Sequence, residues 1–77
     1  MNNRELEVKA KYEADGWRML RGGAPDFIAL KVDEKGGIFE FQGIEVKNSH
    51  DSLSYEQAIY KKLFELAKIE YKVEVVK

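Results

Sequence analysis

Residues 38–47 read IFEFQGIEVK, and the end of this segment alternates between apolar and charged side chains. Ile44 and Val46 have one parity, and Glu45 and Lys47 have the other. Residues two apart share a face in a strand, but they point in different directions on a helix. The segment therefore predicts a strand that presents an acid and a lysine together on one face and two apolar side chains on the opposite face.

The first half of the same segment has the opposite phase. Phe39 and Phe41 share the parity of the charged pair, and Gly43 lies where the phase changes. A β-bulge at Gly43 would return the two phenylalanines to the core side together with Ile44 and Val46. We therefore expect a bulge at this glycine.

The remaining segments give an α+β chain. Helix formers fill residues 3–15, and Gly16 is placed to end that helix. A second amphipathic helix begins at Ser54, because Ile59 and Leu63 continue an apolar stripe from there. Strands are expected at residues 17–20, 26–32, 38–47 and 72–76, which gives the element order αβββαβ.

Composition limits the class of protein. A chain of 77 residues forms one domain over residues 1–77, and roughly 60 to 65% of its unfolded surface becomes buried, so a partner subunit would help its stability. The absence of cysteine excludes disulfides and thiolate metal sites and suits a reducing cytoplasm, either of a cell or of the host of a viral or phage gene. No apolar run is long enough for a membrane span, so we expect no membrane partner.

The net charge of −1 is unusual for a protein that binds nucleic acid, since such proteins carry a basic surplus. A bound divalent cation would cancel acids gathered at one site and leave the basic residues to face phosphate. The charge balance alone therefore does not indicate DNA binding, but it would mislead if several acids were gathered at a metal site.

An acid followed two places later by lysine occurs four times, so the pattern alone is weak. Only Glu45 and Lys47 combine strand geometry with apolar neighbours on the opposite face. The other pairs fall on a helix, in a turn or beside a helix end: Glu7 and Lys9, Asp33 and Lys35, Glu70 and Lys72.

Folding the expected hairpin brings a second acid to this pair. A turn near Lys35 and Gly36 places Asp26 opposite Glu45, and a bulge at Gly43 would shift this pairing by one residue, so we expect the two acids to be neighbours. Directly opposed residues have Cβ atoms about 4.5 to 5.5 Å apart, and like charges at that distance repel unless a cation lies between them. Two carboxylates and a backbone carbonyl form the hard-oxygen site that Mg²⁺ or Mn²⁺ prefers. Lys47 beside that site would orient or help to deprotonate an attacking water.

These residues resemble a known family. Pro25 and Asp26 match the first motif of the PD-(D/E)xK nucleases, and Glu45, Val46 and Lys47 match the second. The segment EVKNSHDSLSYEQ is similar to the extended pattern of one branch, the VRR-NUC (virus-type replication-repair nuclease) domain. The matching positions after the lysine are Leu53, Ser54, Glu56, Gln57 and Tyr60.

The resemblance implies a restriction-endonuclease-like core, with a central mixed sheet flanked by helices. It implies hydrolysis of DNA phosphodiesters by water, leaving a 5′-phosphate, with Mg²⁺ as cofactor and Mn²⁺ as a substitute. The small free-standing members of this branch look like homodimers that cut branched DNA such as Holliday junctions, and the resemblance implies the same for this chain. A longer hairpin, DEKGGIFEFQG, departs from the branch and would either reach DNA or extend the sheet.

The expected metal ligands are Asp26, Glu45 and the carbonyl of Val46. The family also implies a glutamate from the first helix as a contact of the metal or its water. Glu5 fits best, because it shares a face with the apolar residues of that helix, and Glu7 is the fallback.

Several of these residues have simpler explanations. Gln57 would complete a capping box with Ser54, and this role is compatible with a catalytic one. Arg18 and Arg21 flank the glycine loop and would hold DNA phosphates, although surface arginines are common. Two other functions stay open: a non-catalytic DNA-binding or assembly module on the same fold, and a small interaction domain unrelated to DNA.

Overall fold

The computed structural model covers residues 1–77 and has the expected element order, αβββαβ. Its four strands form one mixed sheet in the order β1-β2-β3-β4, in which only the β3–β4 pair is parallel. The predicted α+β class and central mixed sheet are therefore confirmed. The elements are α1 Asn3–Ala14, β1 Arg18–Arg21, β2 Phe27–Val32, β3 Ile38–Lys47, α2 Tyr55–Leu66 and β4 Tyr71–Val75.

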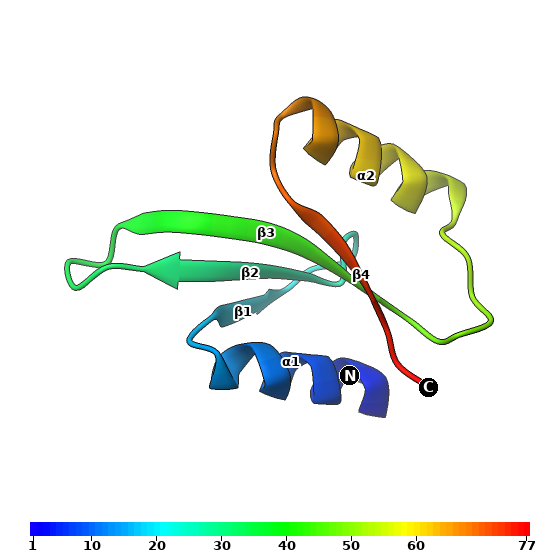
Figure 1. Cartoon of the computed structure of the whole chain (residues 1–77), viewed down its shortest axis with the longest axis horizontal. Helices are drawn as coiled ribbons and strands as arrows, with labels where there is room; N and C mark the ends of the chain where they lie inside the picture. The colour runs from blue at the N-terminus through cyan, green and yellow to red at the C-terminus, as the bar shows by residue number, and fades with distance from the viewer.

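The two helices cover the sheet unequally. Figure 1 shows α1 lying along the sheet beside β1, while α2 stands apart from it, joined to β3 by residues 48–54 and to β4 by the shorter segment 67–70. The β2–β3 hairpin projects beyond both helices (Figure 1). The sheet therefore has one closely covered face and one face that α2 covers only in part.

The hydrophobic core lies between α1 and the sheet. Val8 and Tyr12 of α1 pack against Phe27, Ala29 and Ile44 of β2 and β3, and all five are buried. Gly16 follows this helix with a φ of 91°, a left-handed conformation that glycine adopts without strain, and so ends α1 as predicted. Trp17, Met19, Val46 and Val76 pack around the cluster.

The predicted bulge at Gly43 is wrong. The β2–β3 ladder runs without a break past this residue, with Phe27 opposite Ile44 and Ile28 opposite Gly43. The register shifts instead near the hairpin tip, between Lys31 and Val32.

Close packing explains why position 43 is a glycine. A Cβ atom there would lie 2.9 Å from a ring carbon of Phe64, 3.1 Å from one of Tyr71 and 3.2 Å from Pro25. These side chains come from α2, β4 and the loop before β2. The missing side chain therefore lets three separate segments meet on one face of β3.

The unbroken ladder also changes the place of two aromatic residues. Phe41 shares the face of Gly43, opposite the core face of Ile44, and both Phe41 and Phe39 are exposed. The phenylalanines therefore do not join the core as the bulge would have required.

Neither helix of the structure is long and apolar enough to span a membrane.

We predict that Gly43→Ala lowers the free energy of unfolding by about 1 to 3 kcal/mol, because the added methyl group overpacks the contact with Phe64, Tyr71 and Pro25. Urea denaturation measures the change. Gly23→Ala is the matched control, since a Cβ atom at Gly23 meets nothing within 4 Å. Equal stability of the two variants would contradict this account of Gly43.

Candidate active site

Asp26 and Glu45 lie together where the β2–β3 ladder ends. The last paired residues are Phe27 and Ile44, so the next residue of each strand is one of the two acids. The backbone N–H of Val46 donates a hydrogen bond to Oδ2 of Asp26 over 2.9 Å. The hairpin register expected from the sequence is correct, and it brings the two carboxylates into one neighbourhood.

Glu45 is fully buried, with an exposed fraction of 0%. Its Oε1 atom accepts a hydrogen bond from the Tyr71 hydroxyl over 3.0 Å, whereas its Oε2 atom is buried without a hydrogen-bond partner. An unpaired buried oxygen of this kind costs free energy, and a cation beside it would remove that cost. Glu45 is therefore suited to hold a metal ion.

The surroundings of Glu45 favour its protonated form. Burial raises its pKa to about 7, and Asp26 acts in the same direction through the hydrogen bond that a protonated Glu45 would donate to it and through its charge. The hydrogen bond from Tyr71 and the charge of Lys47 lower the pKa but do not offset the increase. Without a cation, burial and the neighbouring Asp26 therefore shift Glu45 toward its protonated form.

Lys47 lies on the same face of β3 as Glu45, because the two are two positions apart in a regular strand. Its side chain is half-buried, and its charge acts on the Glu45 carboxyl group. The predicted acid and lysine pair therefore shares one site with Asp26.

The backbone of Val46 also faces this site. The N–H and C=O groups of a strand residue point toward the same neighbour, and the N–H of Val46 points at Asp26. The paired part of β2 has ended at Phe27, so this edge of β3 faces the Asp26 carboxylate instead of a strand. The Val46 carbonyl is thus available to a cation there.

The donor set fits Mg²⁺ or Mn²⁺. The structure contains no group of three or more acidic, histidine or cysteine side chains that could hold a metal ion. Mg²⁺ does not require such a cage, because proteins commonly bind it through one or two carboxylates while water and substrate phosphates complete its coordination. Asp26, Glu45 and the Val46 carbonyl are the groups here that would provide a site of that kind.

Glu5 is not brought to the acidic pair. Its Oε1 atom accepts a hydrogen bond from the N–H of Asn2 over 3.2 Å, and its own N–H donates to Oδ1 of Asn2 over 2.8 Å. This capping box begins α1, which packs on the Ile44 face of β3, opposite Glu45. A metal role for Glu5 stays a prediction.

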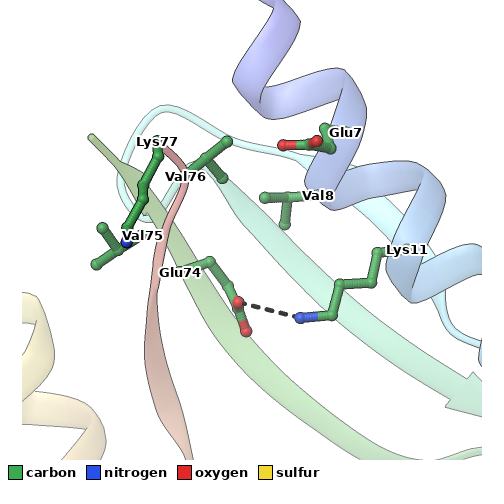
Figure 2. A pocket seen from close by; sticks show the side chains of 7 residues that line it. All are labelled: Glu7, Val8, Lys11, Glu74, Val75, Val76 and Lys77. Carbon is green, nitrogen blue, oxygen red and sulfur yellow. Dashed lines mark hydrogen bonds and ion pairs between the residues drawn. The ribbon is translucent and has the colours of Figure 1, made fainter. Parts of the chain in front are cut away.

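The fallback residue, Glu7, lies in a different place. It lines a hollow of about 440 Å³ between α1 and β4, shown in Figure 2. In the same hollow, the Glu74 carboxylate pairs with Lys11 Nζ at 3.4 Å and accepts a hydrogen bond from Tyr12. Neither Asp26 nor Glu45 lines this hollow.

Gln57 completes a capping box at the start of α2. Its Oε1 atom accepts from the N–H of Ser54 over 2.9 Å, and Ser54 Oγ accepts from the N–H of Gln57 over 3.2 Å. The expected capping role is confirmed, and a catalytic role stays a prediction.

Arg18 and Arg21 are both exposed at opposite ends of β1. They pair with Leu30 and Phe27, and their odd separation turns them to opposite faces of the sheet. The structure therefore does not bring them together, and their contact with DNA phosphates stays a prediction.

Sequence reasoning missed Tyr71. The last strand was expected to begin at Lys72, but it begins at Tyr71, whose hydroxyl reaches Glu45. An aromatic residue before an alternating strand was the available signal. It did not show which part of β3 this strand would join.

Comparison with known proteins gives one match. A family model described as the VRR-NUC domain matches residues 4–77, which is nearly the whole chain and includes both motifs. No curated protein and no solved structure matched the chain. The family match indicates a nuclease-type function on DNA.

We predict that Glu45 makes the metal-free protein less stable as pH rises. Its pKa is about 7 in the folded state and about 4.5 when unfolded, so the folded state binds more protons between these values. The free energy of unfolding should fall across this window by on the order of 3 kcal/mol. Glu45→Gln should remove this fall in urea titrations with EDTA.

Glu56→Gln, at an exposed residue of α2, is the control and should keep the slope of the unchanged chain. A Glu45→Gln variant with the same slope as the unchanged chain would show that Glu45 is not the titrating group.

Proposed function

Because the chain belongs to the VRR-NUC domain family, which acts on DNA as a nuclease, we propose that it is a metal-dependent endodeoxyribonuclease. It hydrolyses phosphodiester bonds with Mg²⁺, and Mn²⁺ substitutes for that ion. The observation that carries this proposal is the buried, unpartnered Oε2 atom of Glu45 beside Asp26.

Each part of the site has a role in this proposal. Asp26, Glu45 and the Val46 carbonyl hold the cation. When bound, the cation polarises the phosphate and favours ionisation of the attacking water. Because the N–H of Val46 donates to Asp26, the backbone of β3 fixes the orientation of this carboxylate before any ligand arrives.

Lys47 has two roles at the same face. Its ammonium group orients the attacking water and offsets the negative charge that grows on the phosphate. The same positive charge favours the ionised form of Glu45, which is the form that binds a cation. A glutamate and a lysine two residues apart on one strand therefore provide both a ligand and a counter-charge.

The proposed substrate is branched DNA such as a four-way junction, and the proposed active form is a homodimer. A two-fold dimer presents two equivalent sites to a symmetric branch. The surface of α2 supports dimerisation, because this helix has no buried residue and exposes Ile59, Leu63 and Leu66. Contiguous exposed apolar surface of this kind marks interaction sites.

We predict that the protein cuts branched DNA in Mg²⁺ and that EDTA abolishes cleavage. Asp26→Ala and Lys47→Ala should each slow cleavage by at least about 100-fold, because each removes a group that acts on the metal, water or phosphate. Asp15→Ala and Lys62→Ala, at exposed positions on the helices or their ends, are controls that should cut normally.

The same gels, run with branched, duplex and single-stranded DNA, separate the alternatives. DNA binding without cleavage would replace the proposal with a non-catalytic DNA-binding module on this fold. A protein that neither binds nor cuts DNA would be an interaction domain unrelated to DNA.

We predict that the protein sediments as a dimer at micromolar concentration. Leu63→Asp should shift it to monomer, because a charge on the apolar face of α2 opposes burial against a second copy. Leu6→Asp is the matched control, since Leu6 of α1 is similarly exposed, at 50% against 52% for Leu63. A monomer formed by the unchanged chain would refute dimerisation.

A further inference from the structure

The Tyr71 hydroxyl group makes the two carboxylate oxygens of Glu45 different, because it hydrogen-bonds to only one of them. It donates to Oε1 over 3.0 Å, while Oε2 makes no hydrogen bond although it is equally buried. A carboxylate with both oxygens in hydrogen bonds would have fewer lone pairs free for a cation, and one with neither oxygen in a hydrogen bond would rotate more freely. The single hydrogen bond therefore fixes the side chain and leaves one oxygen for a ligand.

The Tyr71 ring is itself held in place from two sides. It is 9% exposed and pairs with Gly43 across the parallel β3–β4 ladder, where the missing glycine side chain leaves room for the ring. Phe64 of α2 packs edge-on against it, with ring centroids 5.2 Å apart and planes at 77°. These contacts fix the position of the Tyr71 hydroxyl group. Tyr71 lies on β4 beside Gly43, which is two positions before Glu45 on β3.

We propose that Tyr71 is a positioning residue that sets the affinity of the Asp26–Glu45 site for its divalent cation. The inference rests on the proposed function and extends it to a residue outside both nuclease motifs. Hydrogen-bond partners of metal-binding carboxylates orient them, and their loss weakens metal binding by about 10- to 100-fold. Tyr71 touches neither the phosphate nor the water in this proposal and acts only through Glu45.

The chain provides a matched control for this role. Tyr12 also donates a hydrogen bond from its hydroxyl group to a glutamate on another element, in this case Glu74. That pair lies on the α1 side of the sheet, away from Asp26 and Glu45. Removing either hydroxyl group costs one tyrosine–carboxylate hydrogen bond, but only the loss at Tyr71 affects the proposed metal site.

The test is a calorimetric titration with Mn²⁺ alone, without DNA. We expect Tyr71→Phe to raise the Kd for Mn²⁺ by about 10- to 100-fold, and Tyr12→Phe to leave it unchanged. Phe64→Leu keeps the Tyr71 hydroxyl group but removes the edge contact, and should raise the Kd by a smaller factor. Circular dichroism confirms that each variant is folded before titration, and Phe64→Leu carries the test if Tyr71→Phe does not fold.

Two results would overturn the inference while leaving the metal site intact. One is an unchanged Kd in the folded Tyr71→Phe variant, or in Phe64→Leu where it carries the test. The other is an equal rise in Tyr71→Phe and Tyr12→Phe, which would show a general effect of lost stability. Absence of Mn²⁺ binding by the unchanged chain would instead overturn the proposed metal site, and the role of Tyr71 with it.

Discussion

The structure depends on the burial of one carboxylate. Glu45 lies fully buried in the middle of the sheet with Asp26 beside it, and burial of an acid next to a like charge opposes folding. The fold offsets this cost with the Tyr71 hydroxyl group and the charge of Lys47, yet one oxygen stays without a partner. A divalent cation beside this oxygen would offset that cost.

The two faces of the sheet contain different kinds of side chains. The face under α1 contains the hydrophobic core, built around Phe27 and Ile44. The opposite face contains Glu45 and Lys47, with Gly43 admitting Phe64 and Tyr71 beside them. This division explains why Glu5 is not gathered with the acids, because α1 seals the core on the opposite side. It also explains the exposed apolar side chains of α2, since that helix contacts the sheet mainly where Gly43 lets Phe64 approach.

The near-neutral charge of the chain is consistent with action on DNA. Two of its acids lie side by side where a cation would neutralise them, and some of the remaining charges are paired on the surface, as in Lys9 with Glu13 and Lys61 with Glu65. A cation bound between these acids would therefore make this face more attractive to phosphate than the net charge of the chain suggests. The VRR-NUC match over residues 4–77 agrees with this view of the composition.

The elements, the β2–β3 register and the capping box of α2 could be predicted from the order of the amino acids. These features depend on short-range rules: side-chain alternation, a turn that fixes which hairpin residues face each other, and polar side chains three residues apart. The tertiary structure alone decided the roles of Gly43 and Tyr71 and the separation of Glu5 from the acidic pair. The glycine at position 43 accommodates three side chains from distant segments, and these contacts are not visible in the local sequence, which suggested a bulge instead. Tyr71 reaches Glu45 only because β4 pairs in parallel with β3 after the α2 crossover. Such long-range pairing is set by how helices and strands pack, and no local pattern encodes it.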